Sequence, residues 1–280
     1  MRGPVGAVLL VVAAVQAVVG LLFVFDVSWA VGLLPFEGRT PLSNIFVGSI
    51  FLAAAASTAW CITEGSGRAI AGIALDYVAI FIPFTIVSFA AAAGASSDRA
   101  PALAAFGVST AVGALVGVWL LRWAMARPWT DPRSLPSPIR VAFVVFVLAL
   151  VPVGLVLVLQ VPNILPWPVT PELSTLFGLM FLGAAAYFSF GLLDPRWENA
   201  GGQLAGFLAY DLVLVVPFLV RLPTIEPSLL PNLVVYTVVV IGSGILALFY
   251  LAIHAPTRVR IRTAETPPQP ADRPMPPEAA

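Results

Sequence analysis

Two aspartates stand inside long apolar stretches of the sequence, and they are the residues best placed to carry chemistry. Asp76 lies in the stretch 69–92 and Asp211 in the stretch 203–220. At 1.5 Å of helix rise per residue, each lies about 10–14 Å past the start of its stretch. A carboxylate in hydrocarbon costs at least about 2.5–3.5 kcal/mol on insertion scales. Each aspartate is therefore expected to face water or the interior of a helical bundle, or to be protonated, which suits proton-coupled chemistry.

Polar but uncharged side chains accompany the two aspartates. Tyr77 follows Asp76, Tyr210 precedes Asp211, and Gln203 lies two helical turns before Asp211. No Arg or Lys lies in the interior of an apolar stretch to neutralise either carboxylate. These five residues are the predicted pathway for a substrate or a proton. The alternative is that each aspartate is a structural residue, hydrogen-bonded across helices and worth about 1–2 kcal/mol.

Two prolines lie in the same stretches as the aspartates. Pro83 follows Asp76 by seven residues, and Pro217 follows Asp211 by six. A proline inside a helix removes one backbone hydrogen bond and clashes with the preceding turn. Both positions are predicted to be helix kinks, which serve either as fixed bends or as hinges.

The composition excludes several classes of protein and of site. The chain has 60% hydrophobic and 10% charged residues, whereas a soluble domain has roughly 25% charged residues, so the lipid bilayer is its expected partner. Zero net charge and the lack of a basic block leave nothing to bind nucleic acid. One Cys and one His exclude a disulfide framework, a Cys-rich zinc site and a haem with two His ligands. We therefore expect no metal and no cofactor.

Hydropathy predicts an all-α polytopic integral membrane protein with eight transmembrane helices. A helix that crosses about 30 Å of hydrocarbon needs about 20 apolar residues. Eight stretches satisfy this requirement, and segments rich in Gly, Pro, Ser and Asp separate them. The predicted spans are 4–25, 42–63, 69–92, 101–123, 139–160, 172–193, 203–220 and 230–254.

The placement of arginine predicts the orientation of the chain. With eight spans both termini lie on the same side, and that side holds every Arg except three: Arg39, Arg99 and Arg221. Short cytoplasmic loops retain positive charge during insertion. The protein is therefore expected in the cell membrane, the inner or cytoplasmic membrane of a bacterium, with both the N- and C-termini cytoplasmic.

The two halves of the chain resemble each other. Residues 34–36 (Leu-Pro-Phe) recur as 165–167 (Leu-Pro-Trp) at an offset of 131, and further along Asp76 aligns with Asp211 at an offset of 135. Because four spans is an even number, both halves enter the membrane in the same direction, as a parallel repeat. The predicted organisation is a first four-helix repeat at 1–127, an Arg/Pro-rich cytoplasmic linker at 128–138, a second four-helix repeat at 139–254 and a disordered cytoplasmic tail at 255–280.

Three classes of function remain open from the sequence. The first is a permease or carrier for a small, largely apolar molecule, with Asp76 and Asp211 at the interface between the repeats. The second is a scaffold or accessory subunit that does not transport, in which both aspartates are hydrogen-bonding ties. The third is an intramembrane enzyme with an aspartate pair, although the residues around the two aspartates do not match the usual signatures. The sequence leaves the substrate, the protein partners and the oligomeric state open.

Overall fold

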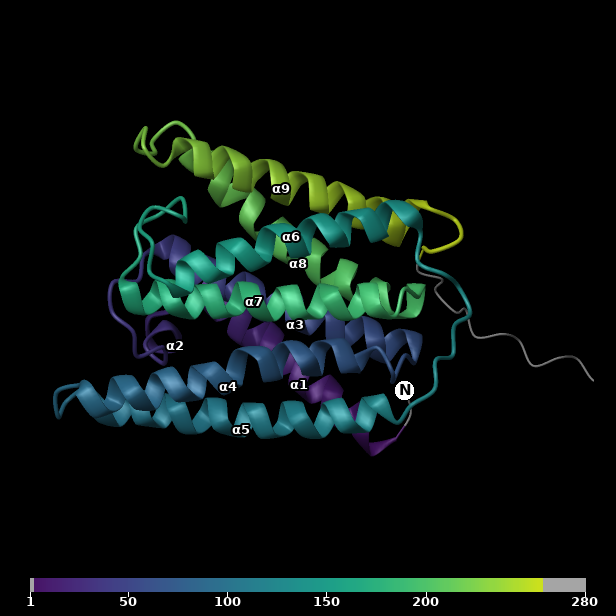
Figure 1. Ribbon diagram of the computed structural model, residues 1–280, viewed down its shortest axis with the longest axis horizontal. Coiled ribbons are helices and arrows are strands. Elements are labelled where there is room, and N and C mark those ends of the chain that lie inside the picture. The colour runs from purple at the N-terminus through teal and green to yellow at the C-terminus, as the bar shows by residue number, and fades with distance from the viewer. Residues whose placement is uncertain (1–2, 259–280) are drawn as a thin grey trace, which may run out of the picture.

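The protein is an all-helical bundle with eight helices long and apolar enough to cross a membrane. The computed structural model describes residues 3–258, and within them the only β feature is an isolated bridge between Ser134 and Arg196. Figure 1 shows the long helices running roughly side by side. They are α1 (Pro4–Val24), α3 (Pro41–Glu64), α4 (Ile70–Gly94), α5 (Ala100–Met125), α6 (Ser137–Val158), α7 (Pro171–Leu193), α8 (Trp197–Arg221) and α9 (Leu230–Leu248). The short α2 (Ser28–Val31) lies between α1 and α3, and α9 continues as a π-helical turn, η1 (Phe249–Ile253).

The number of spans is confirmed, and seven of the eight, with α9 and η1 taken as one span, begin and end within two residues of the predicted positions. Local sequence signals set several of these ends. Thr40 accepts a hydrogen bond from the backbone N–H of Ser43 at the start of α3, and Thr170 does the same for Leu173 in α7. Gly65 ends α3 with a φ of 74°, a left-handed conformation that favours glycine.

The exception is α8, which begins at Trp197 and not near Gln203. The sequence gives no hydropathy signal there because residues 198–203 are polar or small. Because Trp197 and Glu198 are buried in the structure, the first turns of α8 belong to the packed bundle and not to the loop that precedes the helix. Asp211 consequently lies 14 residues, or about 21 Å, from the first residue of its helix, whereas Asp76 lies about 9 Å from the start of α4. The predicted distance of about 10–14 Å from the start of the helix was therefore wrong for Asp211.

The helices form a central layer of four and a periphery of four. α3 packs against α8, and α4 packs against α7, whereas α3 with α4 and α7 with α8 touch only briefly. Each peripheral helix packs on one central helix: α1 on α3, α5 on α4, α6 on α7 and α9 on α8. The first four spans therefore do not form a bundle separate from the last four. The helical hairpins of one half pack on those of the other half.

One end of the bundle carries the segment that joins the two halves, and we call it the linker end; the other is the opposite end. Residues 128–136 are docked there, not free. Glu198 of α8, only 3% exposed, accepts hydrogen bonds from the N–H groups of Thr130 and Asp131, both at 2.7 Å, and from the Thr130 hydroxyl. The indole of Trp129 donates to Asp194 at 2.6 Å. The linker thus covers the start of α8. The predicted tail at 255–280 lies almost entirely outside the described residues.

The outer surface of the bundle is apolar, as a membrane requires. Large hydrophobic side chains are exposed along the peripheral helices, including Val11 on α1, Leu115 on α5, Leu148 on α6 and Val238 on α9. An exposed apolar surface of this extent in water would be an association hazard, but in hydrocarbon it is the stable arrangement. The eight long apolar helices and this apolar surface therefore indicate a multi-pass membrane protein.

Candidate functional site

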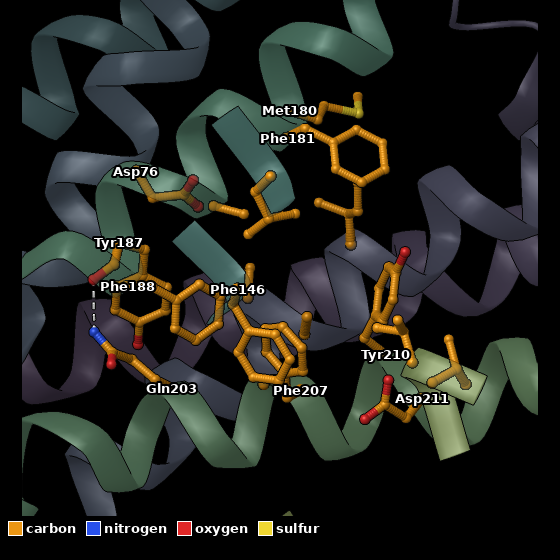
Figure 2. A pocket seen from close by; sticks show the side chains of 18 of the residues that line it. Asp76, Phe146, Met180, Phe181, Tyr187, Phe188, Gln203, Phe207, Tyr210 and Asp211 are labelled. Carbon is orange, nitrogen blue, oxygen red and sulfur yellow. Dashed lines mark hydrogen bonds between the residues drawn. The ribbon is translucent and has the colours of Figure 1, made fainter. Parts of the chain in front are cut away.

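A cavity of about 240 Å³ lies between the central helices and the two peripheral helices of the second half. Its walls come from α3, α4, α6, α7, α8 and α9. Aromatic rings make up much of the lining (Figure 2): Phe46, Phe146, Phe181, Tyr187, Phe188, Phe207, Tyr210 and Tyr236. An apolar cavity of about 150 Å³ binds benzene, so this one is large enough for a ring with a short substituent.

Asp76 enters the cavity from α4. It lies against Gly183 of α7, where a Cβ atom would come within 2.6 Å of the Asp76 Oδ1. That oxygen is enclosed and has no hydrogen-bond partner. The glycine makes room for the carboxyl group, but nothing at this position neutralises or ties it.

Asp211 enters the cavity from α8 and is 3% exposed. Neither of its carboxyl oxygens has a hydrogen-bond partner. The hydroxyl of Ser243 on α9 lies within hydrogen-bonding reach of the carboxyl group, but its one hydrogen is directed to the carbonyl of Val239 at 2.7 Å. Gly244 of α9 brings its backbone next to the carboxyl group, with a hypothetical Cβ 3.5 Å from Oδ2. Asp211 is therefore a buried carboxyl group on the seam between α8 and α9.

The two carboxyl groups line one cavity but are not in contact. Figure 2 shows them on different sides of it, and no hydrogen bond joins them. A pair of aspartates that shares a proton, as in aspartic proteases, needs its carboxyl groups about 3 Å apart. The arrangement suits two separate binding positions in one cavity and not a catalytic dyad.

Two of the other predicted site residues also reach the cavity. Gln203 is 1% exposed, donates through Nε2 to the carbonyl of Tyr187 at 2.7 Å, and keeps its Oε1 without a partner. Tyr210 lines the cavity next to Asp211 and makes an edge contact with the ring of Phe46. The structure therefore brings together Asp76, Asp211, Gln203 and Tyr210.

Tyr77 lies elsewhere. Its hydroxyl accepts a hydrogen bond from Gln16 of α1, and it does not line the cavity. The reason is helical geometry, because Tyr77 follows its aspartate and Tyr210 precedes its own. Successive residues rotate by about 100°, so the two tyrosines lie on opposite flanks of their aspartates.

Sequence reasoning missed the two other tyrosines of the cavity. Tyr187 on α7 and Tyr236 on α9 both line it, and the Tyr236 hydroxyl is buried without a partner. A signal existed, because the chain has only five Tyr and a hydroxyl inside an apolar span needs a partner. Neither tyrosine is next to an aspartate in the sequence, which is the feature that singled out Tyr77 and Tyr210.

Buried aromatic side chains close the cavity at both ends. Toward the opposite end, Trp167 of the loop before α7 is 2% exposed and packs on Phe46, with ring centroids 5.7 Å apart. Toward the linker end, Trp60 and Trp197 form an edge-to-face pair with ring centroids 6.1 Å apart. Trp60 lies about one turn beyond Ser57, and Trp197 lies nearly two turns beyond Gln203. The indole groups therefore separate the cavity from the aqueous sides.

The two predicted kink prolines lie inside their helices, Pro83 in α4 and Pro217 in α8. A third proline, Pro152, lies inside α6 and was not singled out from the sequence. All three helices contribute to the cavity wall. Each proline leaves a carbonyl without its usual helical partner, which weakens the helix at that turn.

Within residues 3–258 no group of three or more His, Cys, Asp or Glu side chains is placed to hold a metal ion. Cys61, the single cysteine, is buried.

Comparison of the chain with protein-family models, with curated proteins and with solved structures finds no match. The geometry of the cavity is therefore what the functional argument rests on.

Proposed function

We propose that the chain is a carrier for a small, largely apolar molecule, with Asp76 and Asp211 as the groups that exchange protons as substrate binds and leaves. The observation that carries the proposal is that both aspartates line one cavity whose walls come from helices of both halves. A binding site between two halves of a bundle is where transporters bind their substrates. Intramembrane carboxyl groups mark substrate and proton pathways in such proteins.

The hydrogen bonding supports this role over that of structural ties. A tie must accept or donate a hydrogen bond across helices, and three of the four carboxyl oxygens are enclosed without a partner. The chain does contain ties, which show the difference. Asn199 on α8 donates to the carbonyls of Phe190 and Asp194, at 3.2 and 3.1 Å. Polar atoms that are buried without partners are destabilising and need a reason to persist.

The packing supports the repeat on which the proposal draws. The helix pairs of the two halves correspond. The packing of α1 on α3 matches that of α6 on α7, and the packing of α4 on α5 matches that of α8 on α9. The contact of α3 with α8 likewise matches that of α7 with α4, so exchange of the two halves leaves the set of packed pairs unchanged. Each half also has a close crossing of two glycines, Gly20 with Gly48 and Gly154 with Gly178. Phe46 and Phe177 are 131 residues apart, the offset that relates residues 34–36 to residues 165–167. Their ring centroids lie 5.0 Å apart, as those of equivalent residues beside a two-fold axis would.

Proton flux in liposomes tests the proposal. The protein is reconstituted into vesicles that contain a pH-sensitive dye, and a pH gradient is imposed. Three probes that share a benzyl group and fit the cavity are added in turn: benzyltrimethylammonium, 3-phenylpropanoate and 2-phenylethanol. At least one probe is expected to dissipate the gradient faster than it does in protein-free vesicles, and the double variant Asp76→Asn, Asp211→Asn is expected to abolish the difference because an amide does not titrate near neutral pH.

The matched control is Ser88→Ala, which removes a buried hydroxyl from α4 away from the cavity and should transport normally. Decay at the protein-free rate with all three probes contradicts coupled transport. Equal fluxes in the wild type and the double variant contradict the role given to the carboxyl groups.

A further inference from the structure

The cavity is closed toward both ends of the bundle but reaches its lipid-facing side between α6 and α9. On α9, Val235 and Val239 line the cavity and are 62% and 45% exposed on the outer surface. On α6, Ala149 lines the cavity and is also exposed. These three side chains form the two edges of one opening, which we call the lateral portal.

The packing of the two helices explains the portal. α6 packs along α7 and α9 along α8, with no extended contact between α6 and α9. In the view of Figure 1, α9 and α6 converge toward the linker end and diverge toward the opposite end. Because α6 and α9 are not held to each other, the wall between them is the weakest part of the cavity. Molecules dissolved in the bilayer therefore have a shorter route to the cavity than molecules in water, which meet Trp167 at one end and Trp197 at the other.

The lining selects the charge of the occupant. Its only acidic or basic side chains are Asp76 and Asp211, so no cationic residue is present to receive an anion. The Oε1 of Gln203 is enclosed against Gly191 of α7 and lacks a donor, so it supplies no charge to the cavity. Eight aromatic side chains line the same cavity as the two aspartates, and aromatic faces attract ammonium groups, most strongly where water is excluded. Carboxylates within an aromatic enclosure are a binding site for an organic cation.

We infer that the substrate is a small lipophilic ammonium compound that enters from the bilayer through the lateral portal and displaces a proton from Asp76 or Asp211. The inference rests on the proposed function and specifies its substrate class and entry route. The exchange balances in charge, because one ammonium ion enters as one proton leaves the carboxyl group.

Binding to the protein in lipid nanodiscs tests the substrate class. Radiolabelled benzyltrimethylammonium is expected to bind the wild type and to be displaced by its unlabelled form, but not by equal concentrations of 3-phenylpropanoate or 2-phenylethanol. Asp76→Asn and Asp211→Asn are each expected to weaken binding by about ten-fold or more, whereas Ser88→Ala leaves it unchanged. Equal displacement by the anion or the neutral probe overturns the substrate class.

A cross-link across the portal tests the route. The double variant Ala149→Cys, Val239→Cys is treated with a short reducible bifunctional thiol reagent, and each sample is compared with itself before treatment. Cross-linking is expected to slow association of the labelled cation by about ten-fold or more, reduction is expected to restore the rate, and the single variant Val239→Cys should respond to neither step. An unchanged association rate in the fully cross-linked protein overturns the lateral route.

The outcomes separate this inference from the proposed function. Proton flux driven by 3-phenylpropanoate or 2-phenylethanol but not by the cation leaves the carrier standing and refutes the ammonium substrate. Binding of the cation without proton flux from any probe refutes the carrier and leaves a cation-binding cavity.

Discussion

Replacement of Asp211 with leucine should stabilise the fold and abolish transport. Asp211 is 3% exposed, and neither carboxyl oxygen has a hydrogen-bond partner. Removal of a buried polar group that has no partner recovers its desolvation penalty, about 1–3 kcal/mol. In leucine two methyl groups replace the two carboxyl oxygens, and the adjoining cavity of about 240 Å³ accommodates their slightly larger volume without overpacking.

Insertion scales set the upper limit of this gain. Aspartate at the centre of a membrane helix costs about 2.5–3.5 kcal/mol, and leucine is favourable by about 0.3–0.6 kcal/mol, a difference of roughly 3–4 kcal/mol. Protonation of the carboxyl group lowers the difference, so we expect the free energy of unfolding to rise by about 1–3 kcal/mol. With about 2–4 °C per kcal/mol for chains of comparable size, Tm should increase by several degrees.

The assay is reversible unfolding in mixed micelles, followed by helical circular dichroism, with proton flux measured on the same preparations. The matched control is Asn199→Leu on the same helix, since Asn199 is equally buried but donates two hydrogen bonds. It should lose about 1–3 kcal/mol because two hydrogen bonds of about 0.5–1.5 kcal/mol each are removed. A loss of similar size in Asp211→Leu would show that the carboxyl group has partners and would refute the argument from unpartnered oxygens. Transport that survives in a stabilised Asp211→Leu would remove Asp211 from the pathway.

Three further predictions concern the rest of the molecule. Reporter fusions after Val161 and after Thr257 should report opposite sides of the membrane, outside and inside respectively; the same side for both would contradict eight spans. Glu198→Ala should lower the free energy of opening of the linker by about 2–4 kcal/mol, since two backbone N–H groups lose a buried carboxylate. Limited trypsin digestion after Arg133, the arginine of the linker, should accelerate at least ten-fold, whereas an unchanged digestion rate would show that other contacts hold the linker. Gly48→Ala and Gly178→Ala should both be severely destabilising in thermal unfolding, because each added Cβ would lie under 3.0 Å from backbone atoms of the neighbouring helix; tolerance of either change would mean that the crossings can widen freely.

The spans could be predicted because hydropathy over about 20 residues does not depend on how the helices pack. The start of α8 could not, because its first turns are polar and are buried by partners distant in sequence. Glu198 is the clearest case, since its carboxylate is satisfied by backbone N–H groups of Thr130 and Asp131, 68 and 67 residues away. A charged residue next to a Pro-rich segment is typical of a solvated loop, and only the fold shows that the two segments meet.

The candidate site was predictable in part for a similar reason. Asp76 and Asp211 are conspicuous because a carboxylate in an apolar helix is costly wherever the helix packs. Which tyrosines accompany them depends on the rotation of each helix and on its neighbour. Tyr77 turns toward Gln16 of α1, whereas Tyr187 of α7 enters the cavity although no aspartate is near it in sequence. Adjacency along the chain is a poor guide to adjacency across helices.

The position of the cavity follows from a difference between the two halves. On the α4 side, the rings of Phe89 and Phe81 fill the space beside Gly107 and Gly113 of α5, so the hairpin of α4 and α5 is tightly packed. On the α8 side, Gly244 of α9 faces the carboxyl group of Asp211 and not an aromatic ring, and α9 meets α8 less extensively.

On the repeat hypothesis, one ancestral hairpin interface has been closed with aromatic rings and its counterpart left open. An open interface costs dispersion contacts and is retained only where something else occupies it. The open interface also holds Asp211, whose carboxyl group has no partner. A bound cation would explain both features, because it would supply the absent packing contacts and a positive charge for the carboxyl group.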